Sequence, residues 1–193
     1  MPTINLPIFP LPIFLLPQGI TRLRIFEARY LKMVSLAMKN NGFVILPEAK
    51  APKSVDFMTG SWVEIIDFDQ SDNGLLLIDV RCKCLVDINK MQQDKDQLHH
   101  GEVSSREHWP DISVDATSEK MATSLKQVFI NNSELDVLYA DKYFQQASWI
   151  VARWLELLPV KLEEKSAFIA PDSFYRAMQF IQGIILSEEN KQN

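Results

Sequence analysis

The sequence contains no apolar run long enough to cross a membrane and only two cysteines among its 193 residues. A membrane-spanning helix needs about 20 consecutive apolar residues, and prolines interrupt the apolar residues near the N-terminus. That segment also lacks the basic start of a secretion signal. Cys82 and Cys84 are alternate residues of one predicted strand, where relaxed disulfide geometry is disfavoured. These absences predict a cytoplasmic protein with free thiols and no membrane partner.

The chain also lacks an excess of positive charge. Its formal net charge is −5, and acidic and basic residues are spread along the sequence without a long run of one sign. Proteins that bind nucleic acid cluster lysine and arginine on one surface. Nucleic acid is therefore not the expected partner.

Recognisable catalytic and cofactor motifs are missing as well. The sequence has no Gly-x-x-x-x-Gly-Lys-[Ser/Thr] phosphate loop and no Gly-x-Ser-x-Gly nucleophile turn. A zinc site could be sought in Cys82, Cys84, His99, His100 and His108, because the two cysteines, and likewise His100 and His108, would share one face of a strand. The cysteines are closer together than in structural zinc sites, and no second cysteine pair exists. We therefore expect no metal, no cofactor and no enzyme activity.

What the sequence does contain is a proline-rich apolar start followed by an amphipathic pattern. Five of the ten prolines lie within the first 17 residues. Each proline removes a backbone donor, so this segment is expected to form short strands at sheet edges or bends. From residue 26 the apolar residues recur with helical spacing. This spacing predicts a helix whose buried face carries Phe26, Tyr30, Met33, Val34, Ala37 and Met38.

The rest of the chain divides into a strand-rich half and a helix-rich half. Strands are predicted over residues 43–46, 62–68, 75–86 and 98–109. Helical spacing is found over residues 121–129, 147–158, 162–169 and 174–185. Asn73-Gly74 predicts a hairpin with a type I′ turn, and Asp172 is the expected N-cap of the last helix. Strands followed by helices indicate an α+β fold with domains 1–116 and 117–193.

Two segments carry a resemblance to a known family. One is LPIFPLPIFLLPQG followed by LRIFEARYLKMV, residues 6–19 and 23–34, and the other is LLPVKLEEKSAFIAPDSFYRAMQFI, residues 157–181. These segments resemble the N-terminal, substrate-binding domain of Lon proteases. The middle of the chain is less similar, because Asp79 stands where many members have glycine. The resemblance implies a PUA-like β pseudo-barrel with one early helix, followed by a C-terminal helical bundle.

The resemblance also implies a function. It suggests a non-catalytic module that binds unfolded or extended polypeptide, with a protease or another protein as a further partner. The ATPase and peptidase parts of a complete Lon protease are not recognisable here, so the chain resembles a stand-alone bacterial member. RNA binding is the second hypothesis, because PUA-like folds include RNA-binding proteins. An unrecognised hydrolase is the third.

Candidate peptide-binding residues are aromatic side chains that regular spacing does not place in a core. Phe9 and Phe14 lie among prolines and Phe57 lies in a predicted loop, so we expect these three to be available for apolar contact. Arg24 is the fourth candidate. It belongs to a charged group around the start of the first helix that could hold a peptide carboxylate or, alternatively, cap the helix and pair locally. The group comprises Arg22, Arg24, Glu27 and Arg29.

Overall fold

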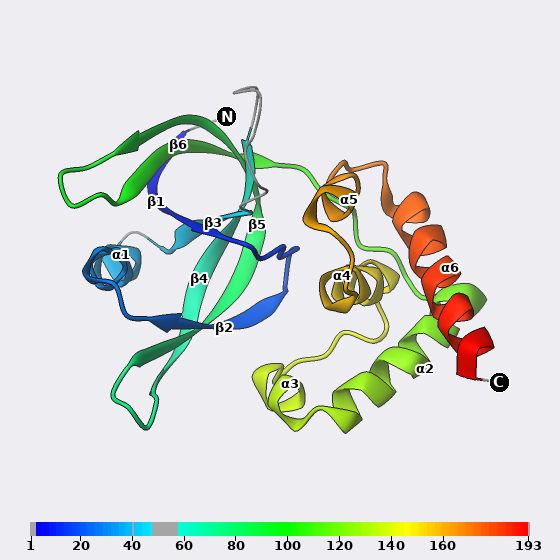
Figure 1. Ribbon diagram of the computed structural model, residues 1–193. Helices are drawn as coiled ribbons and strands as arrows, with labels where there is room; N and C mark the ends of the chain where they lie inside the picture. Colours follow the sequence, from blue (N-terminus) through cyan, green and yellow to red (C-terminus); the bar gives the residue numbers. More distant parts are fainter. Residues whose placement is uncertain (1–2, 40, 48–57, 193) are drawn as a thin grey trace. The chain divides into compact units, whose positions relative to one another are not determined.

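A computed structural model describes residues 3–39, 41–47 and 58–192 of the chain, which fall into two compact units, residues 1–106 and 107–193. The elements of the first unit are β1 (Ile4–Leu11), β2 (Ile20–Ile25), α1 (Ala28–Lys39), β3 (Phe43–Pro47), β4 (Met58–Gln70), β5 (Leu76–Gln93) and β6 (His99–Arg106). Figure 1 shows these strands curled into a barrel with α1 beside it. The predicted order of strands with one early helix, followed by helices, is confirmed.

The strands form one sheet in the order β2-β5-β4-β3-β1-β6, and β6 pairs in addition with β5. This last pairing closes β5, β4, β3, β1 and β6 into a ring. Among the described residues, β2 pairs with β5 alone and therefore remains an edge strand. Among the strand pairs of the described residues, only β1 and β3 run parallel to each other. The arrangement is the predicted pseudo-barrel with one strand outside the closed part.

The interior of the ring is filled by small aliphatic side chains. The cluster consists of Leu6, Ile8, Val44, Val86, Ile88 and Val103. Two glycines allow side chains of the ring interior to pack directly against the backbone. A Cβ atom on Gly60 would lie 2.5 Å from Val44 Cγ1, and one on Gly101 would lie 2.5 Å from Ile8 Cδ1. The ring is therefore a packed core, as in other small barrels, and not a ligand cavity.

A second apolar cluster lies between α1 and the sheet. The helix contributes Tyr30, Met33, Val34 and Ala37 to it, as predicted. The predictions for Phe26 and Met38 were wrong, because their side chains are 66% and 60% exposed. The carbonyl of Glu27 accepts the N–H of Leu31 at 3.1 Å, and the helix begins only at Ala28. Phe26 consequently lies ahead of the helix, between β2 and α1.

The hairpin between β4 and β5 forms where it was predicted, but with a different turn. A type I′ turn needs a positive φ at both Asn73 and Gly74, and only Gly74 has one, at 81°. The N–H of Gly74 donates to the carbonyl of Ser71 at 2.7 Å, and the N–H of Ser71 donates to the carbonyl of Leu75 at 3.0 Å. The Ser71 hydroxyl also accepts the N–H of Leu75 at 3.1 Å. These bonds stabilise a three-residue loop ending in a left-handed glycine.

The second unit is helical and includes residues 107–115 ahead of its first helix. Its elements are α2 (Ala116–Asn131), α3 (Ser133–Leu138), α4 (Ala147–Leu157), α5 (Leu162–Ser166) and α6 (Phe174–Gln192). The short helix α3 was not predicted, because it has no apolar face; its Val137 is 81% exposed. Helix α6 begins directly after Ser173, so Asp172 is not the residue that precedes it.

Helix α4 forms the centre of the second unit and packs against α2 and α6. Its Trp149 ring lies 6.1 Å from that of Phe129, and the indole N–H of Trp154 donates to the carbonyl of Met121 at 3.0 Å. Arg153 is almost fully buried and donates two hydrogen bonds, of 2.8 and 2.9 Å, to the Glu156 carboxylate. Trp149 and Trp154 thus both lie in the core of this unit.

Candidate functional site

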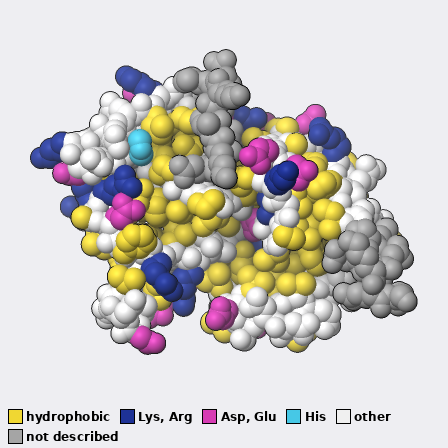
Figure 2. Space-filling model, in the orientation of Figure 1, with side chains coloured by type: hydrophobic (Ala, Val, Ile, Leu, Met, Phe, Trp, Pro, Cys, Tyr) yellow, Lys and Arg dark blue, Asp and Glu magenta, His cyan; other side chains and the backbone are white. Residues whose placement is uncertain are grey.

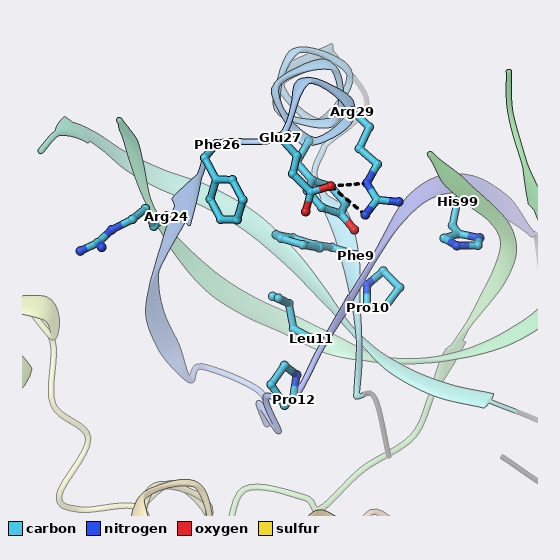
Figure 3. A pocket seen from close by; sticks show the side chains of 10 residues that line it. Phe9, Pro10, Leu11, Pro12, Arg24, Phe26, Glu27, Arg29 and His99 are labelled. Carbon is cyan, nitrogen blue, oxygen red and sulfur yellow. Dashed lines mark hydrogen bonds and ion pairs between the residues drawn. The ribbon is translucent and has the colours of Figure 1, made fainter. Parts of the chain in front are cut away.

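A pocket of about 440 Å³ opens in the first unit between the ends of β1 and β2, and we call it the β1–β2 pocket. The pairing of β1 with β6 stops at Ile8 and His99, and β2 is bonded to β5 on its far side. No described strand fills the space between β1 and β2. Residues 9–12, Arg24, the segment leading into α1, and His99 form the walls (Figure 3). The volume lies in the range of ligand sites, roughly 300–1,000 Å³.

The apolar surface of the pocket is largely aromatic. Phe9 is 6% exposed, and its ring centroid lies 4.0 Å from that of Tyr30 and 6.3 Å from that of Phe43. Phe26 lies on the opposite wall and is 66% exposed. Figure 3 shows its ring beside the same space that Phe9 and Leu11 border. A large exposed ring next to a buried aromatic group is a strong candidate contact for an apolar ligand.

Charged side chains surround these rings. Arg29 Nε and Nη2 each lie 2.8 Å from Glu27 Oε2, and the Arg29 guanidinium lies 4.7 Å from the centre of the Tyr30 ring. Its Nη1 also donates to the carbonyl of Gln97 at 3.5 Å. Arg24 differs from Arg29, because it forms no ion pair with any residue that the structure describes, and its side chain extends away from the rings in Figure 3. Arg24 is thus the charged group of the pocket that remains available to a ligand.

Arg22, two residues earlier on β2, is held by a structural ion pair. Its Nε and Nη2 donate to Asp79 Oδ1 and Oδ2 at 2.6 and 2.8 Å. These hydrogen bonds raise the pKa of Arg22 above its ordinary value. The two residues face each other in the β2–β5 ladder. Asp79 therefore leaves the strand pairing intact and holds the Arg22 side chain in place.

The turn between β5 and β6 is fastened to α1 beside the pocket. Lys32 Nζ donates to Asp94 Oδ2 at 2.7 Å and also contacts the Asp96 carboxylate. Asp94 Oδ1 accepts the N–H groups of Asp96 and Leu98 at 2.9 and 3.0 Å. The bond from Lys32 is the main cause that lowers the pKa of Asp94 well below its usual range, and the same bond raises the pKa of Lys32. This clamp keeps His99, the first residue of β6, at the pocket wall.

The structure brings together two of the four predicted binding residues. Phe9 and Arg24 both line the β1–β2 pocket. Phe14 is only 9% exposed and is not among the lining residues, and Phe57 lies outside the described residues. Phe26 also lines the pocket and was not predicted to, because helical spacing assigned it to the core. The acidic Glu27 was the available signal, since acidic residues are favoured at helix starts and would have placed Phe26 ahead of the helix.

The arrangement does not support the zinc site considered from the sequence. Cys82 belongs to the cluster under α1, whereas Cys84 packs against the cluster inside the ring. The two sulfurs separate because the β4–β5 register shifts between Trp62 and Val63. His108 lies beyond the end of β6, in the second unit, so it shares no strand face with the other histidines. Among the described residues, no group of three or more His, Cys, Asp or Glu is placed to hold a metal ion.

Within the part of the chain that the structure describes, no helix is both long and apolar enough to cross a membrane. On the face shown in Figure 2, basic and acidic side chains are intermixed with apolar ones, and the described Lys and Arg residues do not gather into a broad area. Binding to a phosphate backbone depends on clustered positive charge.

Known proteins similar to this chain were found by family and by structure. The family model described as the ATP-dependent protease La (LON) substrate-binding domain matches residues 5–187. A Lon N-terminal domain protein from Xanthomonas campestris is 25% identical, with a TM-score of 0.70 over 93% of this chain and 98% of that chain. The N-terminal domain of the Mycobacterium avium complex Lon protease is 9% identical, with a TM-score of 0.56 over 92% and 95%, which is a likeness of fold alone. No curated protein matches the sequence.

Proposed function

We propose that this chain, which belongs to the family of ATP-dependent protease La (LON) substrate-binding domains, binds unfolded or extended polypeptide in the β1–β2 pocket. The observation that carries the proposal is the ring of Phe26, which is 66% exposed beside the buried Phe9 and Tyr30. The proposed activity is recognition alone, without ATP and without cleavage. A protease or another protein that acts on the bound polypeptide is the proposed partner.

An unfolded polypeptide has the chemistry that the pocket can use. Its apolar side chains can cover Phe26 and enter the space next to Phe9, and each Å² of apolar surface removed from water contributes about 25 cal/mol. The surface that a ligand could bury in this pocket is small compared with the interface of a stable protein complex, which buries roughly 1,200–2,000 Å². We therefore expect affinity in the micromolar range, about −8 kcal/mol. The free cysteines suit a reducing compartment, so the cytoplasm is the proposed location.

The test is a titration of a fluorescently labelled unfolded peptide, followed by anisotropy, with Phe26→Ala as the test variant. Loss of a central aromatic contact weakens binding by about 1–2 kcal/mol or more, which is a factor of about 5 to 30 in Kd. Phe68→Ala is the matched control, because Phe68 is 46% exposed on β4 and does not line the pocket. It should change Kd by less than a factor of about two.

Salt dependence and two parallel assays distinguish the competing functions. Binding through apolar contacts should change little between low and high salt, whereas phosphate contacts make affinity fall steeply with salt. Equal effects of Phe26→Ala and Phe68→Ala would remove the pocket from the proposal. Salt-sensitive binding of single-stranded RNA without peptide binding would favour an RNA-binding protein, and cleavage of the peptide would indicate a hydrolase.

A further inference from the structure

The edge of β2 that faces the β1–β2 pocket exposes unpaired backbone groups. In an antiparallel ladder, alternate residues direct their N–H and C=O groups toward the partner strand, and the residues between them direct these groups away from it. The N–H of Cys82 donates to the carbonyl of Gly19 at 2.8 Å. Gly19 and Cys82 directly precede the first registered pair of the ladder, Ile20 with Arg81. The odd-numbered residues of β2 therefore bond to β5.

The pairing of β5 with β4, on the other edge of β5, independently shows which residues of β5 bond to β2. The N–H of Ser71 donates to the carbonyl of Leu75, so the odd-numbered residues of β5 bond to β4 and its even-numbered residues bond to β2. Arg22 and Arg24 pair in register with Asp79 and Leu77, which are odd-numbered. Their own N–H and C=O groups consequently point away from β5, toward the side of β2 on which no described strand pairs with it.

The facing edge of β1 is a poorer site for a strand. Beyond Ile8 it no longer pairs with β6, but Pro10 and Pro12 follow, and proline has no N–H to donate. β2 has no proline. Of the two edges along the pocket, β2 therefore offers both donors and acceptors. A polypeptide in the pocket can gain backbone hydrogen bonds mainly from Arg22 and Arg24.

We propose that the polypeptide binds as an additional β-strand along the outward backbone groups of Arg22 and Arg24 on β2. This inference rests on the proposed function and assigns the substrate class: an extended segment without proline at the paired positions, with apolar residues at every second position. Those residues lie on the same side as Leu23 and Ile25 and contact Phe9. The intervening side chains lie on the exposed side with Arg24, whose charge is not paired with any described residue, so acidic residues are favoured there.

The decisive measurement is an N-methyl scan of the peptide against the unmodified protein. One backbone N–H at a time is replaced by N–CH₃, and Kd is measured for each peptide. Strand addition predicts an alternating profile, with at least a tenfold loss where the N–H points to β2 and less than a twofold change at the positions between. A flat profile with unmethylated binding intact would overturn strand addition and leave the proposed function standing. Absence of binding by every peptide, methylated or not, would overturn both.

Two variants of one residue test the protein side. Arg24→Pro removes the outward N–H without removing a bond to β5, and proline is tolerated on edge strands at such positions. Arg24→Ala keeps the N–H and removes the charge. With a peptide that carries no charge, Arg24→Pro should weaken binding at least tenfold, and at least fivefold more than Arg24→Ala does. Equal Kd values for the two variants would contradict the proposal.

A second copy of the chain is the other possible occupant of the edge. Sedimentation of the free protein distinguishes it from a polypeptide substrate. A monomer that binds the peptide one to one supports the proposal. A dimer that dissociates in Arg24→Pro, but not in Arg24→Ala, would show that β2 pairs with another β2 and would overturn it.

Discussion

Phe9 and Phe26 border the same pocket, and replacing each by alanine should affect stability very differently. Phe9 is 6% exposed and Phe26 is 66% exposed. A phenylalanine side chain can bury about 200 Å², so folding covers nearly all of that area for Phe9 and about a third of it, roughly 70 Å², for Phe26. At about 25 cal/mol per Å², the upper limits are roughly 5 and 1.7 kcal/mol.

Both limits decrease because alanine retains its Cβ and because the unfolded chain already buries some surface. For Phe9→Ala the cavity beside Tyr30 and Phe43 adds to the loss, so we expect destabilisation by about 3–5 kcal/mol. For Phe26→Ala we expect about 1 kcal/mol or less.

The measurement is urea unfolding followed by far-UV circular dichroism and by tryptophan fluorescence, so that coincidence of the two transitions can be checked. The slope of the free energy of unfolding against urea should be the same in wild type and both variants, which makes the midpoints directly comparable. A loss for Phe26→Ala as large as that for Phe9→Ala would refute the reasoning. It would mean that the Phe26 ring is packed in the core and is not free to contact a polypeptide.

Two further predictions concern a backbone position and a charged turn. Gly42→Ala should destabilise the protein by on the order of 2 kcal/mol or more, because the φ of Gly42 is 112° and the new Cβ would lie 1.9 Å from the Val63 carbonyl oxygen. Gly183→Ala, in open space on α6, should instead stabilise the protein by about 0.5–1 kcal/mol. Similar urea midpoints for the two variants would contradict this prediction. Asp94→Asn should lower stability at pH 7. Because folding lowers the pKa of Asp94, its contribution is complete above the unfolded value of about 3.9 and is lost as the pH falls below it. The difference in the free energy of unfolding between wild type and Asp94→Asn should therefore shrink below about pH 4. Asp72→Asn, in the β4–β5 turn, serves as the control. A difference between wild type and Asp94→Asn that stays constant down to about pH 2 would argue against the Lys32–Asp94 bond.

Much of the fold could be predicted because it depends on neighbours in the sequence. The buried face of α1 follows from the helical spacing of Tyr30, Met33 and Ala37. The β4–β5 hairpin follows from Asn73-Gly74, although the Ser71 hydroxyl selected a longer loop than the dipeptide predicts. Where no regular spacing exists, as in α3, the prediction failed.

The candidate site was predicted only in part. Phe9 and Arg24 were identified because one lies among prolines and the other at the start of a helix. Phe26 was assigned to the wrong environment, because helical spacing continues backwards past the point where the helix begins. A shift of two residues in a helix boundary thus moved one aromatic ring from a predicted core to an exposed pocket wall.

By itself, the sequence determined the α+β order, the positions of most strands and helices, and the family, because each depends on local patterns that a short segment carries. Only the tertiary structure decided that β6 closes the ring by pairing with β5 and that the pairing of β6 with β1 stops at Ile8. It also decided that β2 pairs with β5 alone among the described strands. These features arise from pairing between segments far apart in the chain. The β1–β2 pocket exists because of them, and no periodicity within one segment encodes which strand edge remains unpaired.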